Sequence, residues 1–474
     1  MRVLAIDQGT SGTKAVVVDE TDAILSIAEV PIRPDYRAGG IVEQDPAELL
    51  ASVRSAGSRA LDDAGVAVDA IALTNQGESV LAWDPVDGST RSPIVVWQDG
   101  RAQAVCDPLR PHAEFVHART GLVLDPYFSA PKLAWLRRNG WVDGVVTTTD
   151  AWLLHHLTGE FVTDVSTASR SLVTGLDDVA YDPALFELFD LTGERMPRIV
   201  DNDAIVGHTT AFGASVPVAG VIVDQQAALI AEDCLDAGAA KCTFGTGAFL
   251  LANNGTSAAR SSHGLTVSVG WRTRGMTHYC TDGQVFTAAS AIRWLQDVGI
   301  VRDAAELDEV ASDDANGVSC IPALAGLAAP WWRSDATASF RGMTLATTRG
   351  DLVTAVLQGI AVQVAMLVEL VGRDAGTPLT SLRVDGGLTR STRFMQAVAD
   401  LAQVPVTVYP TPHATPLGAV ALARMALDPS LAMADAIVRW QPERTILPRW
   451  STDRAAEFRA HWDAQAWREI GEGA

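Results

Sequence analysis

Two stretches of the chain have the residue types and spacing of a hairpin that could hold a phosphate. In the first, 3–18, two apolar strand-like runs flank a turn of Gly, Thr and Ser, with Asp7 before the turn and Lys14 after it. Backbone N–H groups and hydroxyls of such a turn can bind a phosphate, and the acid can hold the accompanying metal. The Gly-x-x-x-x-Gly-Lys spacing and the following helix of a Walker loop are both absent. Taken alone, an ordinary surface hairpin explains the stretch at least as well.

A second stretch, 241–251, repeats the strand, turn and strand pattern, with Gly245, Thr246 and Gly247 in the turn. Two such hairpins in two domains could face each other across a cleft and grip one polyphosphate. Phosphoryl transfer depends mostly on positioning and on charge neutralisation, so a clamp of this kind suits it.

Three acidic residues could take part in that chemistry. Asp224 follows the apolar run 218–223 and opens a helix, where it could accept a proton from an attacking hydroxyl. Alone, a helix N-cap is the favoured interpretation of Asp224. Asp7 could hold a metal or hydrogen-bond its own turn, with about equal weight. Asp385, with the two glycines after it, would allow close approach of a nucleoside, although such a triplet is usually a turn.

The first half of the chain alternates strands and helices. We expect strands over 70–74, 92–97 and 218–223, with polar residues just past their carboxyl ends, where α/β proteins place ligands. The second half restarts with the second hairpin. The expected helices are 132–139, 152–157, 227–232, 288–297, 351–371 ending at Gly372, one from about Ser391, and one through Ala426 with Thr415 as N-cap and Pro416 in the first turn.

Composition limits the function classes. The 474 residues predict two domains, 1–233 and 234–474. A net charge of −21 without a basic run argues against nucleic acid or an anionic membrane as a partner. Five scattered cysteines predict reduced, buried thiols, and a strand at the start predicts no signal peptide, so we expect a cytoplasmic protein. The long uncharged stretches 204–223 and 315–332 contain Gly and Pro and do not predict membrane helices.

Two longer patterns carry a family resemblance. The stretch 127–139 and the stretch 338–358 are similar, in the right order, to the two signatures of the FGGY family of carbohydrate kinases, within the actin/hexokinase/Hsp70 superfamily. The resemblance covers nearly the whole chain. It implies an α/β fold of two actin-like ATPase (RNase H-like) domains flanking a central catalytic cleft. It also implies ATP and Mg²⁺ as cofactors.

Four stretches, 74–76, 95–98, 121–129 and 224–229, resemble the glycerol kinases of this family. The resemblance implies that Asp224 is the general base and that Gln225 binds polyol hydroxyls. Without it, each pocket residue has an ordinary structural explanation in the core, on the surface or in a turn. The implied substrate pocket consists of Gln76, Gly77, Glu78, Trp97, Tyr127, Asp224, Gln225 and Phe249.

The resemblance also implies a nucleotide site. One lip of the phosphate clamp would be formed by Gly9, Thr10, Ser11 and Lys14, with Asp7 on the metal, and the other by Thr246 and Gly247. The residues implied around the nucleoside are Ala289, Arg293, Gly386, Gly387 and Ser391.

The sequence departs from the glycerol kinase pattern at three places. Gly77 stands where those kinases carry arginine, which removes hydrogen bonds worth about 1.5–3 kcal/mol each and leaves room for a longer polyol or a ketose. Lys14 gives the first hairpin a xylulokinase-like form, yet the Asp-Asn and Met-His pairs typical of xylulokinases are missing. The stretch 210–217 is too short for the loop that binds fructose bisphosphate, so we expect no such control.

The sequence therefore predicts an ATP-dependent kinase of a small polyol or sugar with three to five carbons, for which glycerol is not the best substrate. We expect a homodimer or homotetramer. One alternative is a xylulokinase-type ketose kinase. Another is a non-catalytic ATP-binding regulator of the actin or Hsp70 kind, against which Asp224 with its neighbour Gln225 argues.

Overall fold

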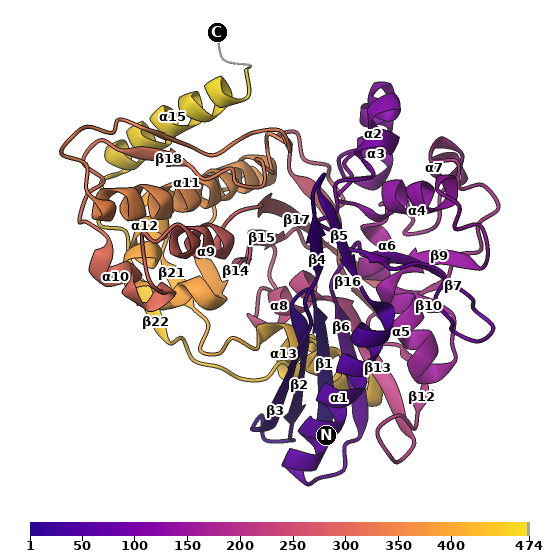
Figure 1. Ribbon diagram of the computed structural model, residues 1–474. Coiled ribbons are helices and arrows are strands. Elements are labelled where there is room, and N and C mark those ends of the chain that lie inside the picture. Colours follow the sequence, from indigo (N-terminus) through magenta and orange to yellow (C-terminus); the bar gives the residue numbers. More distant parts are fainter. Residues whose placement is uncertain (472–474) are drawn as a thin grey trace.

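In the computed structural model, which describes residues 1–471, two large mixed sheets occupy the two halves of the molecule (Figure 1). The N-terminal sheet has the spatial order β12 (Ile205–Thr209), β13 (Val216–Val223), β6 (Ala70–Asn75), β1 (Val3–Gly9), β2 (Gly12–Val18), β3 (Ile24–Pro31). The C-terminal sheet has the order β16 (Thr266–Thr273), β17 (Met276–Val285), β15 (Ala248–Asn253), β14 (Ala240–Phe244), β20 (Leu382–Asp385), β21 (Val406–Val408), β22 (Arg444–Ile446).

The two sheets share one topology. In the first, β1, β2 and β3 form an antiparallel meander, and β6 and β13 then continue parallel to β1. In the second, β14, β15 and β17 form the meander, and β20 and β21 continue parallel to β14. Each sheet therefore opens with one of the two hairpins that the sequence analysis singled out.

Helix α1 (Pro46–Ala64) covers one face of the N-terminal sheet. Asp45 caps its N-terminus by accepting the N–H of Ala47, and Gly65 ends it in the left-handed conformation with φ of 65°. Its apolar side chains pack on β1, β2 and β3. Since helices cover both faces of this sheet, β1 and β6 are apolar almost throughout.

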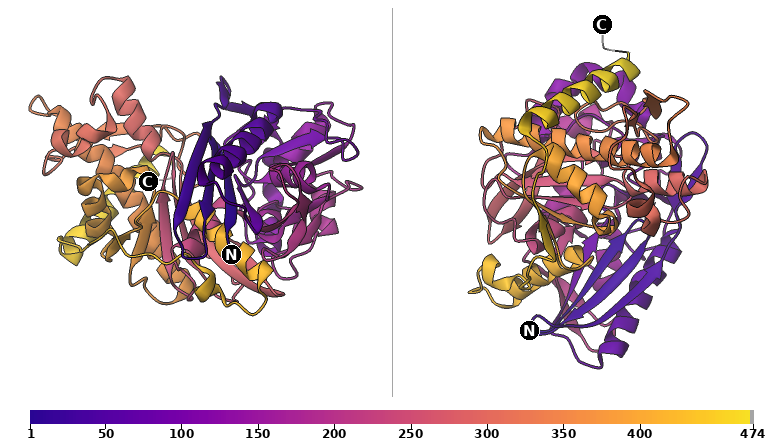
Figure 2. Two further views of the ribbon diagram at one scale, coloured as in Figure 1. Left: turned by 90° about the horizontal axis from the view of Figure 1, so that it is seen from below. Right: turned by 90° about the vertical axis from the view of Figure 1, so that its left-hand side faces the viewer.

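The other face of the N-terminal sheet is covered by a helix from far along the chain. Helix α13 (Ala414–Leu427) packs on β13, β6 and β1 and crosses α8 (Asp224–Ala231) (Figures 1 and 2). The crossing is close because Gly418 has no side chain: a Cβ there would lie 1.9 Å from the carbonyl oxygen of Ala227. A helix from the second half of the sequence thus packs on the N-terminal sheet. A domain boundary at 233–234 therefore stays a prediction.

Two helix ends differ from the sequence-based expectation. Helix α11 (Arg349–Ala375) continues past Gly372 and ends at Gly376, which takes the left-handed conformation with φ of 66°. Helix α13 begins at Ala414, so Thr415 lies inside its first turn and is not the N-cap. Within residues 1–471, α11 is the one helix long and apolar enough to span a membrane, and 83% of its most apolar stretch is buried in the protein.

A smaller sheet positions the substrate-side loops. It has the order β4 (Asp35–Arg37), β5 (Ile41–Gln44), β8 (Ile94–Val95), β7 (Val80–Trp83), β9 (Val145–Thr148). The strand expected over 92–97 is shortened to β8, so Trp97 lies just beyond it. Helix α4 (Ser129–Arg138) packs against β7, and α5 (Thr149–Thr158) follows β9.

The remaining elements complete the two halves. All five cysteines are buried and free, as expected. The C-terminal helix α15 lies at the opposite end of the molecule from the N-terminus (Figures 1 and 2). These elements are α2 (Gln103–Cys106), η1 (Asp107–His112), α3 (Ala113–Thr120), β10 (Val162–Asp164), α6 (Val165–Ser169), α7 (Pro183–Leu188), β11 (Arg198–Val200), α9 (Ala289–Asp297), η2 (Ala304–Glu306), α10 (Leu307–Val310), β18 (Ser319–Ile321), β19 (Ser339–Arg341), η3 (Gly387–Arg390), α12 (Thr392–Ala402), α14 (Met433–Ala436) and α15 (Thr452–Glu469).

The crossing of α8 and α13 makes a stability prediction. Gly418→Ala should lower the free energy of unfolding by at least about 2 kcal/mol, because the new methyl group meets a backbone carbonyl that cannot move away. Urea denaturation measures the change. Gly57→Ala in α1 is the matched control, since its Cβ meets only the ring of Phe212, a side chain that can shift. It should stay within about 1 kcal/mol of the parent protein. Equal losses in both variants would contradict the proposed role of the crossing.

Candidate active site

The carboxyl ends of β1, β6 and β13 meet at one edge of the N-terminal sheet because the three strands are parallel. Asp7 lies opposite Thr74, and Val223 lies opposite Asn75, so Asp224 follows directly at the same edge. A cavity of 190 Å³ opens there between the two halves of the molecule. It is lined by Thr10, Ser11, Gly77, Glu78, Trp97, Tyr127, Asp224, Gln225, Thr246 and Phe249, all of which the sequence analysis had selected.

Asp224 has the setting of a proton acceptor. It is the first residue of α8, whose N-cap is Val223, so the N-cap interpretation of Asp224 was wrong. Its Oδ1 accepts the backbone N–H of Gln225 at 2.7 Å. Burial, and after it the charge of Asp7, raise the pKa of Asp224 to about 6, and the charge of Lys241 opposes that rise. A carboxylate with such a pKa is ionised at neutral pH and basic enough to take a proton.

Lys241 fixes Gln225, the residue that follows Asp224. Its ammonium group is fully buried and donates to Oε1 of Gln225 at 2.6 Å and to Oγ1 of Thr243 at 2.8 Å. The side chain therefore fixes the amide of Gln225 and adds a positive charge near Asp224. The sequence analysis missed Lys241 as a site residue, although a lysine inside an apolar strand was a signal.

Three aromatic side chains form the cavity wall. The ring centroids of Trp97 and Tyr127 are 5.5 Å apart, and those of Trp97 and Phe249 are 5.8 Å apart. The indole N–H of Trp97 donates to Oγ1 of Thr10 at 2.8 Å, which joins the wall to the first hairpin. Lys132 fixes the loop of Tyr127 by donating to the carbonyl oxygens of 126 and 128, each at 2.8 Å.

Glu78 is the acidic residue of the pocket, and its backbone is strained, with φ of 60°. It is almost fully buried, and its Oε1 accepts a hydrogen bond from Nε of Arg170. Burial raises the pKa of Glu78, and Arg170 opposes that rise. Arg170 was missed by the sequence analysis because nothing near it in the chain marks it as a partner of a residue 92 positions away.

Gly77 lines the cavity, and the room that it leaves for a longer substrate stays a prediction. A Cβ at Gly77 would lie 2.9 Å from Cγ2 of Val223, which does not itself line the cavity. Gln76 lies behind the cavity and does not line it. Its Nε2 donates to Oε1 of Gln44 at 2.8 Å, and Nε2 of Gln44 donates to the carbonyl oxygen of Thr10 at 2.7 Å. Gln76 thus supports the first hairpin.

The turn of the first hairpin places Thr10 and Ser11 at the cavity, with Gly9 beside them in β1. Asp7 accepts a hydrogen bond from Oγ1 of Thr74 at 2.9 Å, and no hydrogen bond from its own turn. Lys14 lies opposite Asp7 in the pairing and forms an ion pair with Glu29 at 3.2 Å. Burial raises the pKa of Asp7, and the charge of Lys14 opposes that rise.

The second hairpin is fixed by the segment that begins α9. The carbonyl oxygen of Thr246 accepts the N–H of Ala288 at 2.9 Å, and that of Gly245 accepts the N–H of Ala289 at 3.0 Å. Gly247 packs so closely on β17 that a Cβ would lie 2.6 Å from the carbonyl oxygen of Val285. Arg293 is exposed on α9.

The remaining predicted nucleotide residues follow β20 and lie outside the 190 Å³ cavity. Gly386 has φ of 95° and lies against the backbone of Phe244, while the space around Gly387 is open. Ser391 caps α12 by accepting the N–H of Phe394 at 3.1 Å, and it donates to Oδ1 of Asp308 at 2.5 Å. The open space beside Gly387 is where a nucleoside could approach.

The acidic residues of the cleft fit a metal that arrives with a nucleotide. Buried Asp385 has an Oδ1 without a hydrogen-bond partner, and burial raises its pKa. Among residues 1–471, no group of three or more His, Cys, Asp or Glu side chains could hold a metal by itself. Mg²⁺ usually takes one or two protein carboxylates and completes its shell with phosphates and water.

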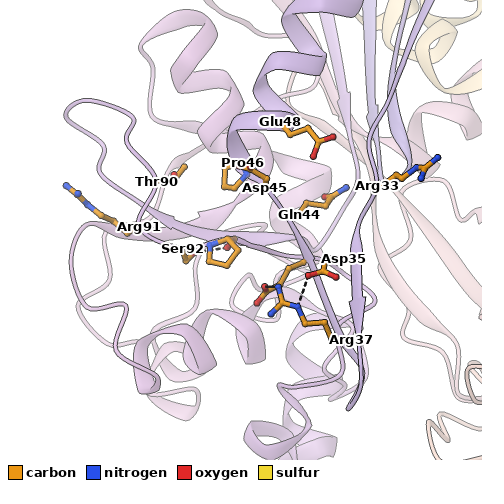
Figure 3. A pocket seen from close by; sticks show the side chains of 12 residues that line it. Arg33, Asp35, Arg37, Gln44, Asp45, Pro46, Glu48, Thr90, Arg91 and Ser92 are labelled. Carbon is orange, nitrogen blue, oxygen red and sulfur yellow. Dashed lines mark hydrogen bonds and ion pairs between the residues drawn. The ribbon is translucent and has the colours of Figure 1, made fainter.

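A larger hollow of 590 Å³ lies over β4, β5 and the start of α1, apart from this site (Figure 3). Arg37 forms ion pairs there with Asp35 at 2.6 Å and with Glu43 at 2.8 Å. Gln44 is the residue that joins the hollow to the first hairpin. Arg37, Asp35 and Glu43 are thus paired with one another within the hollow.

Comparison with known proteins places the chain in a family. Residues 2–231 match the N-terminal domain of the FGGY family of carbohydrate kinases, and residues 240–427 match its C-terminal domain. A glycerol kinase of Aromatoleum aromaticum is 38% identical over 97% of each chain, and glycerol kinase 2 of Thermotoga maritima is 35% identical over 99% of each.

Solved structures agree. A glycerol kinase of Plasmodium falciparum with ADP superposes with a TM-score of 0.90 at 29% identity, covering 99% of this chain and 98% of that one. A xylulose kinase from Rhodospirillum rubrum, at 22% identity and a TM-score of 0.85 over 99% of each chain, shares the fold. The expected α/β fold of two actin-like domains is confirmed. The chain belongs to the FGGY family of carbohydrate kinases.

Proposed function

We propose that this kinase transfers the γ-phosphoryl group of ATP to a hydroxyl of a small polyol of the glycerol type. The observation that carries the proposal is the single cavity that joins the turn of each hairpin, the acid Asp224 and an aromatic wall. The glycerol kinases that match nearly the whole chain, one of them solved with ADP, support the same assignment.

The residues of the cavity have different roles in the proposed reaction. Asp224 accepts the proton of the attacking hydroxyl, and Gln225, held by Lys241, orients the polyol. Glu78 accepts hydrogen bonds from further hydroxyls, while Trp97, Tyr127 and Phe249 pack on the carbon chain. The two halves of the molecule exclude water from the transfer.

The nucleotide would lie along both hairpins. Gly9, Thr10, Ser11 and Lys14 on one side, and Thr246 and Gly247 on the other, would donate to its phosphates. Ala289, Arg293, Gly386, Gly387 and Ser391 would surround the nucleoside. Asp7 would hold Mg²⁺, which supplies neutralisation of the phosphate charge.

Two further features belong to the proposal. We expect a cytoplasmic enzyme that assembles as a homodimer or homotetramer and has neither nucleic acid nor membrane as a partner. The alternative of a ketose kinase of the xylulose type is less well supported, because the relatives that match nearly the whole chain at 35–38% identity are glycerol kinases, whereas the xylulose kinase shares the fold at 22% identity. The non-catalytic alternative does not explain why Asp224 lines the cavity with a raised pKa.

The substrate class is tested by an ADP-release assay over glycerol, erythritol, D- and L-threitol, xylulose, ribulose and arabitol. The three- and four-carbon polyols should exceed xylulose in kcat/KM by at least about tenfold, because the relatives that match nearly the whole chain are glycerol kinases. That glycerol is not the best of these substrates stays a prediction, which rests on the absence of an arginine at position 77. Asp224→Asn should lower kcat by about 10²–10⁴-fold. ATP turnover that no polyol or sugar stimulates would favour the alternative of an ATP-binding regulator of the actin or Hsp70 kind.

The pH dependence tests the base. Asp224 must be ionised to accept a proton, so kcat/KM for the polyol should fall as the pH drops through about 6. Lys241 lowers the pKa of Asp224, so Lys241→Met should move this acidic limb to higher pH. Lys132→Met is the matched control, because this buried lysine fixes the loop of Tyr127 and should weaken polyol binding without moving the limb. An unmoved limb in Lys241→Met would refute the electrostatic link.

The contact between Gly77 and Val223 predicts how an arginine could be accommodated. Gly77→Arg alone should lose activity, because its Cβ meets Cγ2 of Val223. Gly77→Arg combined with Val223→Ala removes that contact and gives the polyol a new charged donor, so the KM for glycerol should fall about tenfold or more relative to Val223→Ala. Steady-state kinetics with glycerol distinguish the three variants. Equal glycerol KM values in the double variant and in Val223→Ala would show that position 77 does not face the substrate.

A further inference from the structure

Arg170, the residue that follows α6, lies between the pocket acid and the other half of the molecule. Its Nε donates to Oε1 of Glu78, and its Nη1 donates to Oδ2 of Asp282 at 3.1 Å. Glu78 belongs to the loop after β6 of the N-terminal sheet, and Asp282 to β17 of the C-terminal sheet. The three side chains are buried, with 6%, 4% and 3% of their surfaces exposed for Arg170, Glu78 and Asp282.

Arg170, Glu78 and Asp282 form a buried triad, and hydrogen bonds from two neighbouring side chains fix Asp282. Thr266 donates its hydroxyl to Oδ1 of Asp282 at 2.6 Å, and Gln284 donates to Oδ2. Gln284 lies opposite Phe249 in the pairing of β15 with β17, and Phe249 lines the cavity. The position of Arg170 is therefore set by β17, the strand that pairs with the strand of Phe249.

Arg170 also contacts the aromatic wall. Its guanidinium carbon lies 5.9 Å from the ring centroid of Tyr127 and 5.7 Å from that of Phe128, which are cation–π distances. Arg170 does not itself line the cavity. Its contacts with Glu78 and Tyr127 reach the substrate only through those two residues.

The energetics make the triad sensitive to the loss of one member. A buried carboxylate that loses its cation either takes up a proton or moves toward water. A protonated Glu78 would be a weaker acceptor for polyol hydroxyls.

We propose that Arg170 is a positioning residue of the substrate pocket, which holds Glu78 as an ionised acceptor and, through Asp282, makes that acceptor depend on the contact between the two sheets. The inference rests on the proposed function, in which Glu78 binds the polyol. It assigns to Arg170 a charge behind the pocket, which acts through Glu78 and Tyr127.

The test uses steady-state kinetics with glycerol and ATP on the full chain. Arg170→Met should raise the KM for glycerol about 10- to 100-fold while the KM for ATP changes less than about twofold. Arg170→Lys, which keeps the charge, should recover part of the loss, and Asp282→Asn should show a smaller rise. If Arg170→Met does not fold, Asp282→Asn carries the test, since it keeps the shape and removes the ion pair.

The matched control is Arg272→Met. Arg272 on β16 forms an ion pair with Asp201 at 2.5 Å, also between the two halves of the molecule, but away from the cavity. It should leave the KM for glycerol unchanged. Equal effects of Arg272→Met and Arg170→Met would overturn the inference and would indicate a general loosening of the interface.

A double variant separates this inference from the proposed function. In a Glu78→Gln background, Arg170→Met should have no further effect on the KM for glycerol, because Arg170 acts through Glu78. An additional effect as large as in the parent protein would overturn the positioning role. If Glu78→Gln itself leaves the KM for glycerol unchanged, the assignment of Glu78 to the polyol fails, and the proposed pocket fails with it.

Discussion

The parallel pairing of β1, β6 and β13 is the constraint on which the site depends. Because the three strands run in the same direction, their carboxyl ends meet at one edge, and Asp7 and Asp224 come within electrostatic reach of each other. The pairing holds only while both faces of the sheet are covered, by α1 on one side and by α13 on the other. The close crossing of α13 with α8 at Gly418 therefore also fixes the helix that begins with Asp224.

The sequence was sufficient for those features of the site that are local in the chain. Each hairpin is a continuous stretch, and Asp224 stands at a strand-to-helix junction that periodicity reveals. The aromatic wall came from the resemblance, since Trp97, Tyr127 and Phe249 lie far apart in the chain and have ordinary core interpretations. The ten residues that line the cavity all belong to the predicted set, so the fold brings these segments together at one place.

The sequence could not predict contacts between segments that lie far apart in the chain. Arg170 is a partner of Glu78 and Asp282, which lie 92 and 112 positions away, and no local pattern marks such contacts. The contact between Val223 and position 77 could not be predicted either, because it depends on how the strand of Val223 packs beside the loop of Gly77. The end of α11 was misplaced for a related reason: Gly372 is compatible with a buried helix, and only the backbone shows that Gly376 takes the left-handed turn.

The charge distribution of the cleft explains how a strongly acidic chain can act on a nucleotide. Half-buried Asp7 and Asp224 and buried Asp385 lie there with raised pKa values, and Lys14 and Lys241 oppose only part of that rise. A polyphosphate approaching three carboxylates meets repulsion unless a divalent cation comes with it. Asp7 also raises the pKa of Asp224, second to burial, because its charge disfavours the ionised form of Asp224. The carboxylate proposed to hold the metal thus also acts on the proposed base, and the parallel strands β1 and β13 place the two side by side with β6 between them.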